Sequence, residues 1–348
     1  MADNKATSKA QEFKALSKKD QQRKIGDLIL NNAMYIIIAI AIIFITVKQP
    51  KFISLSSIVN IISLTAAKLP IALGIGGCIV LTGTDISAGR VAACISASLL
   101  TTVFKVFPNM TSAMPIPVVL LIVLGVGAAV GFVNGFSVAK FKLHPFIVTL
   151  STQLITYGII LMYLMNGVNN GQTLSGLTDS YRSLITGTLF TIGGVAIPRY
   201  VLYAVILTAV MWVIWNKTTF GKNMFAVGSN EEAANVSGVN VARTIILVFM
   251  LAGVMYGITG FFDGARIASA NANTGLNYDA IAACVIGGVS FVGGIGRISG
   301  IVVGVLLLQI IFAGLNFLSV DPNMLYIIKG LIILVACAID MRKYLVRK

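Results

Sequence analysis

The sequence predicts an all-α membrane protein with about ten transmembrane helices, and three observations support this fold class. Of the 348 residues, 57% are hydrophobic and only 11% are charged, whereas about 25% are charged in an average soluble domain. Unbroken apolar runs recur along the chain, most of them near the length of about 20 residues with which a helix crosses a bilayer. Basic residues gather between the runs and near both chain ends. A soluble enzyme is thereby excluded, and so is a β-barrel, whose strands would alternate polar and apolar residues.

Each apolar run is expected to form one crossing. The expected crossings cover residues 28–47, 60–81, 91–107, 116–138, 145–165, 200–215, 245–262, 281–296, 299–318 and 324–340. Many of the 34 glycines recur at every fourth position, as at Gly127, Gly131 and Gly135. Because helices in lipid associate through close contact at small residues, these glycine faces are expected to be seams between helices, some of them broken helices.

The charge distribution predicts how the chain is oriented. A net charge of +14 would suggest a nucleic-acid partner in a soluble protein. In a membrane protein it follows from the preference of Lys and Arg for cytoplasmic loops, so no nucleic acid is expected. We therefore expect a basic cytoplasmic tail over 1–27, a polytopic domain over 28–340 and a second cytoplasmic tail over 341–348, without cleavage of a signal peptide. The loop 216–244 is then inside, and the polar segment 166–199 is outside.

A weak internal repeat relates residues 75–91 to residues 286–302 at an offset of 211. Both segments begin with Ile-Gly-Gly and are expected to start as helices that run from outside to inside. The repeat is therefore parallel, as a duplication about an axis normal to the membrane would give. Chance similarity within glycine-rich sequence is the alternative.

No constellation for catalysis is recognised. His144, the single histidine, precedes Pro145, and no phosphate-binding GxxxxGK[ST] motif is present. The four cysteines lie in or beside apolar runs without metal-ligand spacing. We expect neither enzymatic activity nor a bound cofactor. Carboxylates fall at the ends of the expected crossings, which argues against a proton relay and favours energy supplied by a partner.

The loop 216–244 contains a short helix signal. Ser229 and Glu232 have the spacing of a capping box, Ala233 and Ala234 favour helix, and Gly238 can end it. The segment is either a solvated connector or a docking element. Its Glu-Ala-Ala-x-x-x-Gly pattern resembles the EAA loop of ABC importer permeases, in which a short helix sits in a cleft of the ATPase subunit. That resemblance implies ATPase coupling by the residues Glu231, Glu232, Ala233, Ala234 and Gly238.

Further segments resemble the ribose/galactose/xylose class of sugar ABC permeases, from about residue 30 to the carboxyl end. The matching blocks are Thr-Gly-Thr-Asp-Ile-Ser-Ala-Gly-Arg at 82–90, Asn-Gly at 134–135 with Phe-Ile-Val-Thr-Leu-Ser-Thr at 146–152, the block at 220–228, and Asp-Ala-Ile-Ala-Ala with its continuation at 279–291. The first block is closer to the galactose/methyl-galactoside branch than to the ribose branch. Where the class often has Tyr-Glu-Leu, this chain has Leu276-Asn277-Tyr278, so no role for a glutamate is transferred.

The resemblance implies a permease subunit in the cytoplasmic (inner) membrane that imports galactose, methyl galactoside or glucose. It also implies an extracytoplasmic sugar-binding protein, a tandem-domain ATPase that binds MgATP, and a second permease copy, identical to the first. Ribose, xylose or another small ligand of the same class is the first alternative. An ion-coupled secondary transporter is the second.

A path for a neutral sugar needs hydrogen-bonding groups of moderate affinity. The candidates for a path or gate are Lys68, Asp85, Ser87, Arg90, Arg266, Asn277 and Asp279. Asp85 is either a cap or ion-pair partner of the third helix or part of a gate, and Lys68 either reaches the interface or lines the path. The segment from Arg266 to Asp279 is either a solvated outside loop or a receiving surface for the sugar or its binding protein.

Overall fold

The computed structural model describes residues 33–100, 115–165, 174–175, 179–267, 269–270 and 275–345. It confirms the helical fold class, and six of the described helices are long and apolar enough to cross a membrane. The helices are α3 (Ala33–Lys48), η1 (Pro50–Ile53), α4 (Leu55–Val80), α5 (Ala88–Cys94), the π-helix η2 (Ile95–Leu100), α8 (Ile116–Phe141), α9 (Pro145–Met165), α10 (Asp179–Thr186), α11 (Arg199–Lys217), α12 (Thr219–Ser229), α13 (Glu231–Val236), α14 (Val241–Ile267), α15 (Leu276–Ile286), α16 (Ile298–Phe317) and α17 (Pro322–Leu345).

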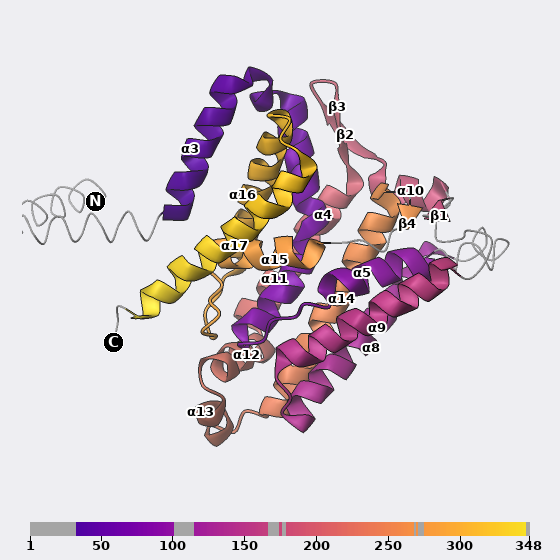
Figure 1. Cartoon of the computed structure of the whole chain (residues 1–348). Coiled ribbons are helices and arrows are strands. Elements are labelled where there is room, and N and C mark those ends of the chain that lie inside the picture. The colour runs from indigo at the N-terminus through magenta and orange to yellow at the C-terminus, as the bar shows by residue number, and fades with distance from the viewer. Residues whose placement is uncertain are drawn as a thin grey trace, which may run out of the picture.

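Two short antiparallel strand pairs accompany the helices. They are β1 (Leu174–Ser175) with β4 (Ser269–Ala270), and β2 (Thr188–Ile192) with β3 (Val195–Pro198). The β2–β3 hairpin projects at one end of the bundle, and α12 and α13 lie at the opposite end (Figure 1). These are called below the hairpin end and the α13 end. The tail 1–27 and most of the segment 166–178 fall outside the described residues.

The expected crossing over 281–296 is wrong in its second half. Helix α15 ends at Ile286, and residues 287–297 are not helical. Gly288, Gly293 and Gly294 in this stretch have positive φ angles, which an α-helix does not accommodate. Every other expected crossing contains a described helix, although the ranges 28–32 and 101–107 lie outside the described part.

Helices α4 and α14 form the centre of the bundle, and α14 packs along α8 through a glycine seam. A Cβ at Gly127 would collide with the carbonyl of Gly253, and one at Gly131 with the carbonyl of Phe249. The two backbones are therefore in direct contact. The seam expected from the glycine spacing on α8 is confirmed, and it replaces side-chain interdigitation by backbone proximity.

The hairpin end is held to the core by α10. Tyr181 is fully buried, and its hydroxyl donates a hydrogen bond to the carbonyl of Phe261 in α14. Burial raises the pKa of Tyr181, so the hydroxyl stays protonated and remains a donor. This contact ties the segment that precedes the hairpin to the central helix.

The internal repeat is visible in the arrangement of the helices. At an offset near 211, α3, α4, α5 and α8 correspond in order to α14, α15, α16 and α17. Helices α4 and α15 lie side by side in the same direction, because Lys68 contacts Asp279 and the Cys284 thiol contacts the Ala72 carbonyl. Lys68 and Asp279 are equivalent positions, and they face each other directly. This geometry supports a parallel repeat whose two copies meet between α4 and α15.

The seam predicts unequal effects for two glycines of α8. Gly131→Ala should lower stability by about 1–3 kcal/mol because overpacking forces α8 and α14 apart. The matched control is Gly125→Ala, since a Cβ at Gly125 meets nothing within 4 Å. Thermal unfolding of the purified variants in one detergent measures the difference. Equal melting temperatures would show that the seam has no energetic role.

Candidate functional site

The loop helix expected near residue 230 is present as α13, but its cap differs from the expectation. Ser229 is the last residue of α12, so the Ser229–Glu232 capping box is wrong. The cap is Asn230, whose side chain accepts a hydrogen bond from the amide of Ala233 at 2.8 Å. Asn is as good a cap as Ser, and the extended backbone of Asn230 separates the two helices. The predicted helix is confirmed, but its cap was predicted one residue too early in the sequence.

Helix α13 exposes nearly all of its surface. Glu231, Glu232 and Ala233 are exposed, whereas Ala234 is buried against the bundle. Val236, an apolar side chain, is 90% exposed at the end of the helix. Gly238 follows with φ +83° and turns the chain back toward α14. The helix therefore presents acidic and apolar side chains outward while one alanine anchors it.

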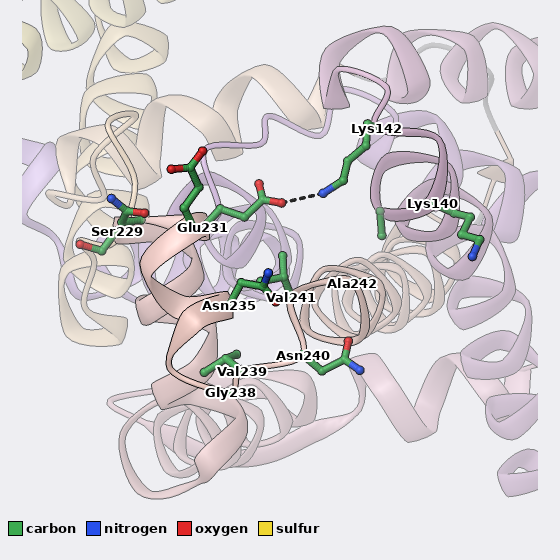
Figure 2. Close-up of a pocket in the computed structure, with 13 residues that line it drawn as sticks. Lys140, Lys142, Ser229, Glu231, Asn235, Gly238, Val239, Asn240, Val241 and Ala242 are labelled. Carbon is green, nitrogen blue, oxygen red and sulfur yellow. Dashed lines mark hydrogen bonds and ion pairs between the residues drawn. The ribbon is translucent and has the colours of Figure 1, made fainter.

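An open cleft of about 1080 Å³ separates α13 from the end of α8. Figure 2 shows Lys142 reaching across it to Glu231, with 2.7 Å between ammonium and carboxylate. Both side chains are at least half exposed, so solvent screens the attraction and its strength is modest. Lys142 itself has φ +54°, which turns the chain from α8 toward α9 and presents the side chain to the cleft.

Helix α12 links this exposed element to the buried core. A Cβ at Gly228 would collide with the carbonyl of Val80, the last residue of α4. That carbonyl accepts a hydrogen bond from the Gly294 amide at 2.8 Å. A Cβ at Gly293 would in turn collide with the Gly228 carbonyl. The end of α12, the end of α4 and the 287–297 loop are thus in backbone contact.

The Asp85 carboxylate is fully buried in the link between α4 and α5. One oxygen accepts from the Ser87 amide at 2.9 Å and from the Ser87 hydroxyl at 2.6 Å, and the other accepts from the Tyr256 hydroxyl at 3.1 Å. Asn134 of α8 then donates to the Ser87 hydroxyl at 3.3 Å. Ser87 is the cap position of α5. Asp85 therefore holds the residue that starts the helix and joins α5 to α8 and α14.

Two other candidates form separate local contacts. The Arg90 guanidinium lies 4.1 Å from the centre of the Tyr157 ring, which connects α5 to α9. Arg266 pairs with Asp263 one turn earlier in α14 at 3.1 Å. Arg266 therefore belongs to the end of α14 and not to a solvated outside loop, and Asn277 is buried within α15. The structure does not bring Arg90, Arg266 and Asp85 into one site.

Lys68 and Asp279 form the ion pair that the sequence analysis missed. Their charged groups are 2.8 Å apart, and Asp279 is only 6% exposed. Lys68 stands near the middle of the 26-residue helix α4, so the alternative in which it reaches the membrane interface is wrong. The Asp279 carboxylate lies at the same height in the bundle as the Lys68 ammonium. Asp279 lies in the first turn of α15, at the end of the expected crossing as predicted, but it is buried and does not belong to a solvated loop.

Lys329 of α17 completes this cluster and was not recognised from sequence. Its ammonium lies 2.9 Å from Asp279, and 4.6 Å from the centre of the Phe312 ring. The signal was a lysine that interrupts the last apolar run, which is unusual inside a membrane helix. Tyr256 was also missed, because an isolated tyrosine in an apolar run gives no hint that it meets a carboxylate 171 residues earlier.

A bundle of long apolar helices, with buried charges between them and an exposed capped helix at one end, defines a multi-pass membrane permease. Residues 57–337 match the family model described as "Branched-chain amino acid transport system / permease component". The match covers most of the chain, and the chain belongs to this family. No solved structure shows a significant match.

Curated relatives of the chain include permeases named for particular sugars. The chain is 42% identical over 336 residues to the galactose/methyl galactoside import permease protein MglC of Haemophilus influenzae, a match covering 94% of this chain and 99% of the relative. It is 42% identical to MglC of Escherichia coli, over 90% of this chain and 95% of the relative. The ribose import permease protein RbsC of Haemophilus influenzae is 34% identical, over 91% and 95% of the two chains.

The capping geometry predicts the stability of α13. Asn230→Ala should destabilise this helix by about 1 kcal/mol because the Ala233 amide loses its acceptor. Hydrogen exchange of the α13 amides, read by mass spectrometry, should become faster by about fivefold. Asn235→Ala is the control, since Asn235 is exposed within the same helix. Equal exchange in the two variants would contradict the role of the cap.

Proposed function

We propose that this permease imports galactose or methyl galactoside, with glucose as a further substrate, in an ATP-driven transporter. The observation that supports this sugar is the 42% identity, over nearly the whole chain, to permeases named for galactose and methyl galactoside import. Identity to a ribose import permease is 34%. Ribose, xylose or another small ligand of the same class is therefore the second choice.

ATP is hydrolysed by a separate tandem-domain ATPase, which binds MgATP, and α13 is the element that docks into it. The support is the form of α13: a short capped helix, exposed on nearly all sides and in backbone contact, through α12, with the core. Four of the coupling residues lie on α13, and Gly238 follows its C-cap Ser237; the four are Glu231, Glu232, Ala233 and Ala234. A partner that moves α13 therefore moves the ends of α4 and of the 287–297 loop.

The α13 end lies on the cytoplasmic side of the inner membrane, and so do both chain termini. Lys140, Lys142, Lys217, Lys222 and Arg243 lie on the elements next to α13, and basic residues in short loops mark the cytoplasmic side. An extracytoplasmic binding protein then delivers sugar at the hairpin end. A second, identical permease copy completes the pore, and this chain binds no cofactor of its own.

An ion-coupled secondary transporter is the competing mechanism, and the buried Asp279 is the observation in its favour. A membrane carboxylate that takes up and releases a proton is a common device in such transporters. Two lysines face Asp279, however, at 2.8 Å and 2.9 Å, so its carboxylate is already engaged in ion pairs with side chains of the same chain. We therefore favour ATP as the energy source.

Reconstitution of the complete transporter separates these mechanisms. The permease, purified with its native neighbours and placed in lipid vesicles, should bring an ATPase subunit with it. ATP turnover should rise several-fold when a galactose-loaded binding protein is added, and galactose should accumulate only with ATP. Accumulation driven by an ion gradient without any ATPase would refute the ATP-driven mechanism. Stimulation by ribose and not by galactose would refute the proposed sugar.

The docking role of α13 predicts an uncoupled transporter. Val236→Asp and Glu232→Lys should leave folding intact because both side chains are exposed. Each should reduce galactose-stimulated ATP turnover by about tenfold, since an interface residue of this kind contributes 1–2 kcal/mol or more. The matched controls are Val236→Ile and Glu232→Asp, which keep the apolar side chain and the negative charge at the same exposed positions and should retain stimulation. Normal stimulation in both Val236→Asp and Glu232→Lys, at equal amounts of assembled complex, would exclude α13 as the coupling element.

A further inference from the structure

The ion cluster formed by Lys68, Asp279 and Lys329 lies within the apolar depth of the bundle. Lys68 comes from the middle of α4, Asp279 from the first turn of α15, and Lys329 from α17. Figure 1 shows α15 at the centre of the bundle, close to α4, α16 and α17. Charged side chains at this depth are costly, and where they occur they commonly mark the route of a substrate or ion.

The charges of the cluster do not balance. One carboxylate faces two ammonium groups, with distances of 2.8 Å to Lys68 and 2.9 Å to Lys329. Each ammonium has three N–H donors, and within the described part of the chain both lysines direct their hydrogen bonds to Asp279 alone. Lys68 also interacts electrostatically with Asp263 at the end of α14, but Asp263 has its own partner in Arg266, and one lysine would have sufficed to neutralise Asp279. The second lysine adds donors that a purely structural ion pair does not need.

An aromatic face and an amide complete the surroundings. Both ammonium groups lie over the Phe312 ring, at 5.8 Å for Lys68 and 4.6 Å for Lys329. Gln309, one turn before Phe312 in α16, is 3% exposed and lines the same small void as Asp279. A carboxylate accepts hydrogen bonds and ammonium and amide groups donate them, while the electron-rich face of an aromatic ring attracts C–H groups of positive polarity. A polyhydroxylated ring has all of these partners.

The position within the repeat gives a second, independent observation. Lys68 belongs to the first copy, whereas Asp279, Gln309, Phe312 and Lys329 belong to the second copy. The Lys68–Asp279 pair joins equivalent positions and therefore lies on the axis between the copies. In secondary transporters built from repeats, substrate sites lie at the repeat interface, and one repeat moves against the other around the site. The same placement is adopted here for the repeat of this permease.

We propose that Lys68, Asp279 and Lys329, with the face of Phe312, form a binding site for the hydroxyl groups of the transported sugar. This proposal rests on the proposed sugar transport and names its site. The void beside the cluster measures about 10 Å³, room for roughly one water molecule. The mutual ion pairs close the site in this conformation, and it opens when α15 and α17 separate from α4. The sugar hydroxyls then replace the ion-pair hydrogen bonds.

Lys329 is the best residue for a test because its removal leaves the Lys68–Asp279 pair intact and no carboxylate unpaired. Lys329→Gln keeps two N–H donors, and Lys329→Met keeps similar bulk without any. In vesicles that contain the complete transporter and saturating galactose-loaded binding protein, Lys329→Met should reduce the maximal uptake rate about three- to tenfold below Lys329→Gln, the worth of one hydrogen bond. Lys48→Met, an exposed lysine at the hairpin end, is the matched control.

Thiol labelling tests the same site without relying on transport rate. Lys329→Cys in the complete transporter is treated with a charged, membrane-impermeant thiol reagent, with and without ATP and vanadate, and labelling of residue 329 is read by mass spectrometry. Labelling should occur in at least one trapped state and should be slowed about tenfold by galactose, but not by betaine at the same concentration. Lys48→Cys should react in every state, whatever sugar is present.

Either of two results would overturn the site: equal uptake by Lys329→Met and Lys329→Gln at equal stability, or labelling of residue 329 that is absent in every state or unaffected by galactose. Both would leave galactose uptake by the unsubstituted transporter, and thus the proposed function, in place. Failure of the unsubstituted transporter to take up galactose would instead overturn the proposed function, and the site with it.

Discussion

A broken helix leaves backbone polar groups without their helical partners, and where these groups are buried the protein itself must supply hydrogen-bond partners. This constraint governs how the permease interrupts its helices near the α13 end. The chain interrupts its helices at two equivalent places, residues 81–87 after α4 and residues 287–297 after α15. In the first, Asp85 and Ser87 bond to one another, to Tyr256 and to Asn134. In the second, Gly294 bonds to the Val80 carbonyl.

Glycine makes this arrangement possible because backbones then come into contact without side chains between them. The same device recurs at the α8–α14 seam and where Gly287 meets Gly300 between α15 and α16. Such contacts have little freedom to adjust, since the atoms that meet are backbone atoms. A displacement at one element is therefore passed to its neighbour and is not absorbed by side-chain rearrangement.

The helices and the seam were accessible to sequence analysis because each depends on short-range periodicity. Hydropathy located nine of the ten expected crossings on described helices, and glycine spacing located the seam on α8. The end of α15 was missed because an apolar run hides the positive φ angles of Gly288 and Gly293. The cap of α13 was placed one residue early because Ser229 and Asn230 are both good caps, and only tertiary contact decides between them.

The candidate site was less accessible, and the reason is again physical. Lys68 and Asp279 were interpreted separately, and Lys329 was not singled out. An isolated charged residue in an apolar run can lie either at the membrane interface or in the protein interior. Pairing decides between them, and the partners are 211 and 50 residues apart in sequence. The offset of 211 was already present in the internal repeat, so the repeat contained the information that these two positions face each other. A parallel repeat with adjacent equivalent helices predicts contacts between equivalent residues.

These contacts form a continuous physical route between the exposed helix and the buried charges. From α13 the chain passes through Asn230 into α12, and Gly228 of α12 touches the end of α4 and the loop that follows α15. Helices α4 and α15 then continue in parallel to Lys68 and Asp279. If α12 displaces the 287–297 loop further than it displaces Val80, then α15 moves relative to α4. That movement separates the two repeats at their shared axis. The ion pair on that axis is the contact that such a shift must break.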